Sequence, residues 1–204
     1  MTKAVWGAGI RLAVAGVLGL VSVSCGTQAR EGTSSSYLII KVLEGASGVD
    51  PGTFGTMVAS DVITLKDDVF TFFSDPGRVT FSLALKDPGP SSSPVTPTQN
   101  NAITVNRYRV RYIRSDGHNI QGVDVPYAFD DAFTVTVGGG DTTAGFTIVR
   151  NQAKQEAPLA ALQLNPIVVS TIAEVTFYGH DQTGREVIVV GNIGVSFANF
   201  GDPK

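Results

Sequence analysis

The chain has 204 residues, of which 43% are hydrophobic, with 15 basic and 18 acidic side chains and a formal net charge of −3. A mildly acidic chain without a basic run is a poor candidate for binding nucleic acid. The chain has one cysteine, Cys25, which excludes an intramolecular disulfide, so its stability must come from packing.

The chain opens with a segment typical of an exported protein. Lys3 and Arg11 make its front positive, and residues 12–23 are uncharged and rich in Leu, Val, Ala and Gly. A positive front, about 7–15 apolar residues and a small-residue end are typical of a secretory signal peptide, whereas a membrane-spanning helix needs about 20 apolar residues. We therefore expect residues 1–24 to be a signal peptide.

The end of this segment resembles the lipobox of bacterial lipoproteins, in which a cysteine is lipidated and becomes the new N-terminus. The residues at positions 23, 24 and 26 agree with that motif, but Ser22 stands where the motif has Leu, Val or Ile. The resemblance implies acylation of Cys25, which would attach the protein to a membrane. The alternative is an incidental cysteine near a signal that is cut elsewhere, for example after Ala29.

The rest of the chain predicts a short tether and one β domain. Residues 25–36 are small and polar, which is typical of a flexible linker, and residues 37–204 alternate apolar runs with Gly/Pro turns. Expected strands are 37–43, 57–64, 69–73, 79–86, 103–114, 133–137, 145–150, 168–178 and 186–197, with a short helical turn at 157–162. Many short strands without a sustained helical period predict an all-β fold, a single antiparallel β-sandwich of immunoglobulin-like architecture.

Turn chemistry separates the expected strands. Asp-Pro-Gly occurs at 50–52, 75–77 and 87–89. In such a unit the Asp side chain bonds the local backbone, Pro fixes φ and Gly accepts positive φ, so each copy predicts a turn. Asp-Gly at 116–117 and Thr-Gly at 183–184 predict two more reversals, the second within a hairpin.

Four stretches have a family likeness: Val-Asp-Val-Pro-Tyr-Ala-Phe at 123–129, Ser-Thr-Ile-Ala-Glu-Val-Thr-Phe-Tyr-Gly at 170–179, Asp-Gln-Thr-Gly at 181–184 and Phe-Ala-Asn-Phe-Gly-Asp at 197–202. They resemble bacterial exported proteins of unknown activity that are described as lipoproteins. The last hairpin is also similar to the closing strands of immunoglobulin-like or fibronectin type III modules in bacterial surface proteins. Neither resemblance implies a known activity, so neither assigns functional residues.

The strand Asn-Arg-Tyr-Arg-Val-Arg-Tyr-Ile-Arg at 106–114 carries the candidate binding residues. Period-two alternation places Arg107, Arg109 and Arg111 on one face of the strand and the Tyr and Val side chains between them on the other. Three guanidinium groups in a row could hold an anionic ligand, such as an acidic glycan, or a protein partner through forked hydrogen bonds. The alternative is an outer sheet face whose arginines pair with carboxylates on neighbouring strands.

Motifs for catalysis or metal binding are not found in the sequence. The acidic pairs at 67–68 and 130–131 lack the spacing of a calcium loop, and His118 and His180 have no second ligand at zinc spacing. Because the sequence also has no nucleophile elbow, phosphate loop or His-Glu-x-x-His helix, we expect no catalytic residue, metal or cofactor.

These observations predict a non-enzymatic protein of the bacterial cell envelope. We expect it to be exported, anchored to a membrane through lipidated Cys25, and to bind or scaffold an envelope protein or an anionic glycan. The alternatives from other classes are an exported hydrolase acting on envelope carbohydrate and a structural subunit of an envelope assembly.

Overall fold

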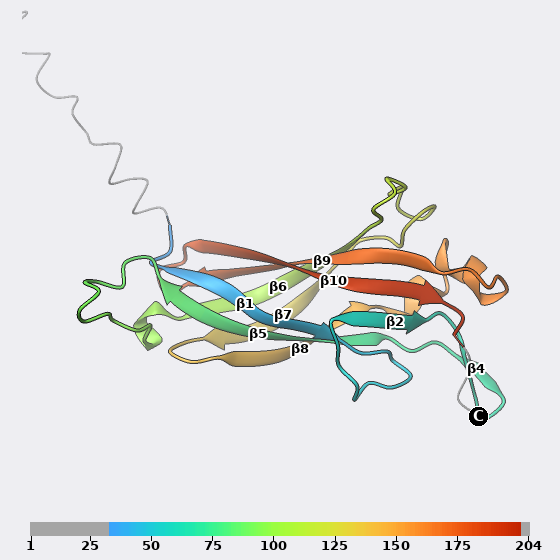
Figure 1. The fold of residues 1–204 in the computed structure, drawn as a ribbon, viewed down its shortest axis with the longest axis horizontal. Coiled ribbons are helices and arrows are strands. Elements are labelled where there is room, and N and C mark those ends of the chain that lie inside the picture. Colours follow the sequence, from blue (N-terminus) through green and yellow to red (C-terminus); the bar gives the residue numbers. More distant parts are fainter. Residues whose placement is uncertain (1–32, 201–204) are drawn as a thin grey trace, which may run out of the picture. The chain divides into compact units, whose positions relative to one another are not determined.

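The fold is taken from a computed structural model, which describes residues 33–200 (Figure 1). The predicted signal peptide, Cys25 and most of the predicted tether lie outside the described residues. Within the described range, the structure contains no helix long and apolar enough to cross a membrane.

Nearly all of the regular secondary structure in the described chain is β-strand. The short helical pieces are η1 (Gln99–Asn101), α2 (Asn151–Lys154) and η2 (Leu159–Gln163). The strands are β1 (Ser36–Gly45), β2 (Met57–Asp61), β3 (Thr64–Lys66), β4 (Val69–Thr71), β5 (Asp75–Leu85), β6 (Ile103–Ile113), β7 (Phe129–Val137), β8 (Thr142–Val149), β9 (Val169–Asp181) and β10 (Glu186–Ala198).

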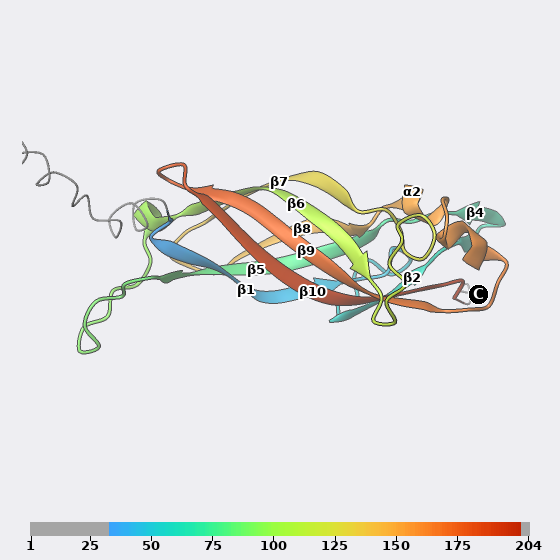
Figure 2. The same ribbon diagram turned by 90° about the horizontal axis from the view of Figure 1, so that it is seen from above.

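Two sheets form the layers of a β-sandwich (Figures 1 and 2). One has three strands in the order β1-β5-β8, and the other has five in the order β2-β10-β9-β6-β7. The strands β3 and β4 form a separate hairpin, whose two turn residues, Asp67 and Asp68, both have positive φ. The prediction of an all-β sandwich is confirmed.

The core between the sheets is built on aromatic rings. Phe177 of β9 lies with its ring centroid 5.0 Å from that of Phe81 on β5 and 5.4 Å from that of Phe146 on β8. Tyr108 of β6 lies 5.2 Å from Phe146. Edge-to-face contacts of this kind add to the free energy gained from burying apolar area. The alternating residues of β6 and β9 therefore fill the space between the layers.

Hydroxyl groups on β6 also join the two sheets. Tyr108 accepts a hydrogen bond of 3.1 Å from the amide of Thr147 on β8, and the hydroxyl of Tyr112 donates one of 2.7 Å to the carbonyl of Ile148. Both tyrosines are almost completely buried. Tyr112 finds its partner across the layer boundary, and Tyr108 makes its shorter bond there, beside a longer one of 3.4 Å to Asp131 on β7 of its own sheet. The two bonds between the layers help to fix how the sheets are placed on each other.

The main differences from the sequence-based expectation concern three segments. The strand predicted at 57–64 ends at Asp61 as β2, and β2 pairs in parallel with β10, so the five-stranded sheet is mixed rather than purely antiparallel. The strand predicted at 133–137 begins at Phe129. The Asp-Pro-Gly unit at 75–77 is not a turn, because it forms the start of β5 and pairs with β8 and β1.

Candidate functional site

The three arginines of β6 lie on the outer face of the five-stranded sheet, as the alternation predicted. Their side chains are about half exposed, whereas Tyr108 and Tyr112, on the opposite face of the strand, point into the core. We call the surface formed by Arg107, Arg109 and Arg111 with their cross-strand neighbours the arginine face.

Each arginine of this face is paired with a carboxylate on a neighbouring strand. Arg107 and Arg109 lie 2.9 Å and 3.3 Å from the two carboxylate oxygens of Asp130 on β7, and Arg111 lies 2.9 Å from Glu174 on β9. Three positive charges therefore face two negative ones. A free anion would have to compete with these ion pairs, so the charge available for binding is small.

The same face also carries apolar groups. The guanidinium of Arg107 lies 4.0 Å from the centre of the Tyr178 ring on β9. Ile188 and Val190 of β10 are exposed on the next strand, opposite Tyr178 and Thr176. Arginine, an aromatic ring and aliphatic side chains on a flat sheet are a composition found in protein interfaces.

A second candidate surface lies at one end of the sandwich, where β6 finishes and β9 begins. We call it the apolar end, and it consists of the β3–β4 hairpin and the connections β6–β7 and β8–β9 (Figures 1 and 2). Its exposed large apolar side chains are Leu65, Val69, Phe70, Ile120, Val123, Tyr127, Leu164, Ile167 and Val168.

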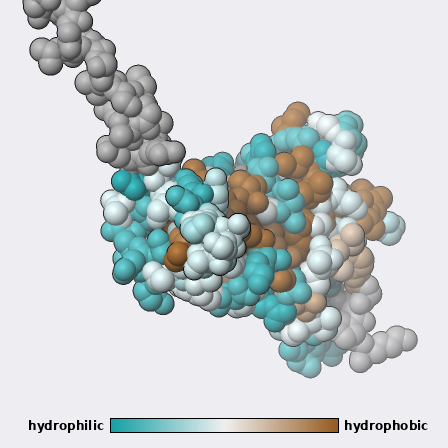
Figure 3. Space-filling view, turned by 60° about the vertical axis from the view of Figure 1, so that its left-hand side comes forward, coloured by the Kyte–Doolittle hydropathy of each residue, from teal (hydrophilic) through white to brown (hydrophobic). Residues whose placement is uncertain are grey.

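The opposite end has different chemistry. Its connections, 86–102, 138–141 and 182–185, expose Val95 as their one large apolar side chain. In Figure 3 this end is turned toward the viewer, and hydrophilic colours dominate there, while brown side chains gather farther toward the right. The first described residues, around Ser34, join β1 at the polar end, so the apolar loops lie at the far end of the described domain from them (Figure 1).

Two hollows lie among the apolar-end loops. One, of about 620 Å³, is lined by the β1–β2 connection, the β3–β4 hairpin and the residues that follow β4, including Val49, Leu65 and Phe73. The other, of about 230 Å³, lies between the β6–β7 connection and α2, with Tyr127 and Arg150 among its lining residues. Concave surface and exposed apolar side chains therefore occur at the same end of the domain.

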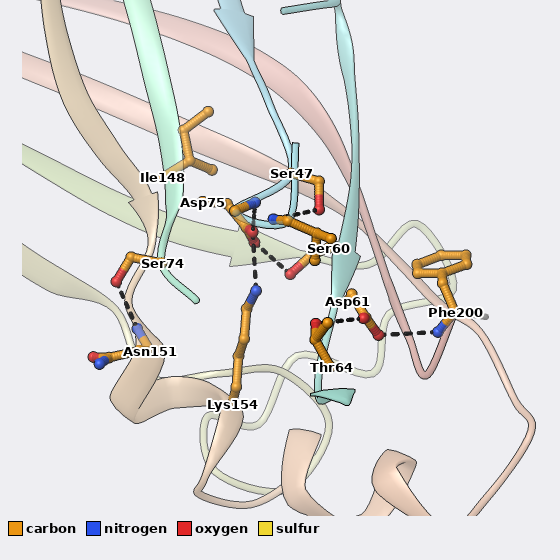
Figure 4. A network of polar contacts seen from close by, with 12 residues as sticks. Ser47, Ser60, Asp61, Thr64, Ser74, Asp75, Ile148, Asn151, Lys154 and Phe200 are labelled. Atoms are coloured by element: carbon orange, nitrogen blue, oxygen red, sulfur yellow. Dashed lines mark hydrogen bonds and ion pairs between the residues drawn. The ribbon is translucent and has the colours of Figure 1, made fainter. Parts of the chain in front are cut away.

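Beneath this end, a polar network is buried in the core (Figure 4). Lys154 of α2 reaches Asp75 at the start of β5, with Nζ 2.9 Å from Oδ1, and both side chains are essentially inaccessible to solvent. Asp75 also accepts hydrogen bonds from the Gly48 amide at 2.7 Å and the Ser60 hydroxyl at 2.5 Å. The start of α2 is held beside this site because the Asn151 amide donates to the hydroxyl of Ser74 at 3.0 Å.

Burial determines the acidity of this network. Desolvation raises the pKa of the Asp75 carboxyl, and this outweighs the attraction of Lys154 and the bonds from Ser60 and Gly48, which lower it. Asp61, the residue after Ser60 on β2, also has its pKa raised by burial, although Thr64 and the Phe200 amide donate to its carboxylate.

The two histidines, for which the sequence predicted no catalytic or metal-binding role, lie in different elements, one in the β6–β7 connection and the other near the end of β9. The ring of His118 is exposed and lies 3.5 Å from Asp116, and Nδ1 of His180 lies 3.2 Å from the carbonyl of Asp181. Among residues 33–200, no group of three His, Cys, Asp or Glu side chains is placed to hold a metal ion. Cys25, the predicted lipidation site, is outside the described residues.

Comparisons with known proteins identify neither a family nor a function. No protein-family model matches the sequence, and a search of curated proteins finds no significant match. The site must therefore be interpreted from its own chemistry.

Sequence reasoning missed the buried network. Asp75 stands in an Asp-Pro-Gly unit that has the composition of a turn, and Lys154 stands in a short polar stretch typical of an exposed loop. Neither residue carries a local signal of burial, because the contact joins segments far apart in the chain.

Proposed function

We propose that the protein is an exported, lipid-anchored β-sandwich of the bacterial cell envelope that binds a protein partner through its apolar end. The observation that carries this proposal is the concentration of exposed apolar side chains in the loops of one end, far from the point where the chain enters the domain. A tether attached at the polar end would leave the apolar end free to contact a partner.

Exposed apolar side chains favour association with a protein surface. Burying apolar area contributes about 25 cal/mol per Å², so exposed side chains such as Val69, Phe70 and Leu164 would gain free energy on binding. Grouped exposed apolar side chains on a folded domain are typical of interaction sites.

The charges of this end favour a protein over a membrane as the partner. Carboxylates at 67, 68, 116, 124 and 156 outnumber the accessible basic groups at 66, 114 and 150. An anionic lipid surface attracts basic segments and repels acidic ones. The chemistry fits a partner with an apolar patch bordered by basic side chains.

Site-specific photo-crosslinking in the bacterial cell tests this proposal. A photoreactive residue at Phe70 or Leu164 should yield one defined crosslinked protein, and the same residue at Val95 of the polar end should not. With the identified partner, Val69→Ser should weaken binding about tenfold or more, as expected of a contact near the centre of an interface. Val95→Ser is the matched control, because the two valines are similarly exposed, at 61% and 58%.

The arginine face is tested in the same experiment. A photoreactive residue at Arg109 should give no crosslink to the partner, and changing Arg107, Arg109 and Arg111 together to alanine should leave partner binding unchanged. Crosslinks from Arg109 but none from Phe70 would move the binding surface to the arginine face and refute the assignment to the apolar end.

The anchor and the absence of catalysis have separate tests. The intact mass of mature protein from a bacterial host should show a chain that starts at Cys25 and carries a diacylglycerol group, and an unmodified chain that starts later would end the lipoprotein proposal. Hydrolysis of envelope carbohydrate that is lost on changing His118 or His180 would replace the binding role with the enzymatic one.

A further inference from the structure

The buried pair Lys154–Asp75 is unusual in how few partners its amine has. An ammonium group carries three N–H donors. Among the described residues, Nζ of Lys154 has one acceptor, Oδ1 of Asp75, although its side chain is only 1% exposed. A charged lysine here would leave two donors unsatisfied in the core, which is costly.

The neutral form of the pair removes much of that cost. If one proton passes from the ammonium to the carboxylate, a neutral amine faces a carboxylic acid, and neither group carries a buried net charge. Desolvation raises the pKa of Asp75, which is the direction that favours this transfer. A neutral amine has a free lone pair and is a nucleophile.

The surroundings hold the acid in place beneath this amine. Oδ1 of Asp75 accepts the Gly48 amide at 2.7 Å, and Oδ2 is bonded to the Ser60 hydroxyl at 2.5 Å. Nζ lies 2.9 Å from Oδ1, so the amine is in contact with the carboxyl group (Figure 4). Fixing two reacting groups in contact replaces a bimolecular encounter with an intramolecular step.

We infer that Lys154 and Asp75 join in an intramolecular amide bond, which makes this pair a site of self-catalysed covalent modification. The lone pair of Nζ attacks Cγ of the protonated Asp75 side chain, forming the C–N bond. The C–Oδ2 bond then breaks, one N–H proton passes to Oδ2 through the Ser60 hydroxyl, and Oδ2 leaves as water. The step requires no oxidant, reductant or other reagent.

The residues around the pair would assist each part of this reaction. The Gly48 amide donates to Oδ1, the oxygen that carries negative charge in the tetrahedral intermediate and remains as the amide carbonyl. The apolar core excludes the water that would hydrolyse the product. The product would link β5 covalently to the helix that follows β8, in a chain whose single cysteine cannot supply such a link.

Peptide mapping of the full chain tests the inference. The protein is purified folded, denatured and digested with trypsin, which cuts after Lys and Arg. Without the bond, the digest contains peptide 67–78 and is cut after Lys154. With the bond, the cut after Lys154 is lost, and peptide 67–78 is found joined to 151–185 with a mass lower than their sum by one water molecule. A fully unlinked digest from folded wild-type protein overturns the inference, whatever the variants do.

Two substitutions test whether Asp75 and Lys154 are the residues that form the bond. Asp75→Asn should still react, but by losing ammonia, so its linked peptide should have the same mass as that of the wild type. Lys154→Arg keeps the positive charge without the primary amine and should give no linked peptide. A linked peptide that persists in Lys154→Arg would show that the link is elsewhere and would overturn the assignment.

Discussion

Removing the hydroxyl of Tyr108 tests whether the tyrosines of β6 hold the two sheets together. In Tyr108→Phe the ring and its aromatic contacts stay, but the amide of Thr147 loses the acceptor that lies 3.1 Å away in the core. Thr147 lies at a register shift in the β5–β8 pairing, where the regular ladder is interrupted. The bond from Tyr108 to Asp131 is long, at 3.4 Å, and contributes little.

The cost of this change follows from the amide left without a partner. An unsatisfied buried donor costs about 1–3 kcal/mol, so we expect Tyr108→Phe to lower the free energy of unfolding by about 2 kcal/mol. Tyr112→Phe removes a donor from the Ile148 carbonyl, and because a carbonyl can accept elsewhere, about 1 kcal/mol is expected. Tyr37→Phe is the control, since Tyr37 is exposed and should change stability by less than about 0.5 kcal/mol.

Urea unfolding followed by far-ultraviolet circular dichroism measures these differences. The midpoint should fall in the order Tyr37→Phe, Tyr112→Phe, Tyr108→Phe with an unchanged slope, which assigns the effect to the native state. A loss below about 0.5 kcal/mol for Tyr108→Phe would refute the argument, because the Thr147 amide would then have another partner.

Three further changes test other parts of the fold. Phe177→Ala, which empties the centre of the aromatic core, should cost about 3–5 kcal/mol in the same unfolding assay. Asp67→Asn with Asp68→Gly should raise the melting temperature, because both positions have positive φ and Asn-Gly suits a two-residue hairpin turn. Burial alone would raise the pKa of Asp181, but hydrogen bonds from the turn that follows outweigh it and lower the pKa below 3.8. Its charged form therefore stabilises the fold above pH 3.8, and the stability lost in Asp181→Asn should shrink as pH falls through that lowered pKa.

Local patterns in the sequence predicted the structural features that depend on neighbouring residues, such as the face to which a side chain points and the position of a turn. The alternation in β6 placed the arginines outside and the tyrosines inside, because successive side chains of a strand point to opposite faces. The turns at Gly117 and Gly184 were also predicted correctly, and both glycines have positive φ. Carboxylates on neighbouring strands were expected as partners of these arginines. Which strands supply them depends on the order of the strands in the sheet, which the local sequence does not contain.

The Asp-Pro-Gly units show where local reasoning ends. In the unit at 87–89, Asp87 accepts a hydrogen bond from the Gly89 amide at 3.1 Å, and Gly89 has φ +78°, so the local bond and the positive φ expected of this unit are both present. In the identical unit at 75–77, the carboxylate of Asp75 is instead held by Lys154. The three residues of the two units are identical, so the burial of Asp75 depends on partners from distant segments, which the unit itself does not contain.

The parallel pairing of β2 with β10 affects how the domain can fold. Gly194 of the last strand pairs with Met57, so an early segment completes its sheet only against the final one. Contacts between such distant segments form slowly, because a long loop must close before they contribute free energy. Until the last strand of the domain is in place, β2 has no partner in this sheet and the edge of β9 that β10 covers stays open. An incomplete chain would therefore expose unpaired strand edges, which are the sites where β-proteins aggregate.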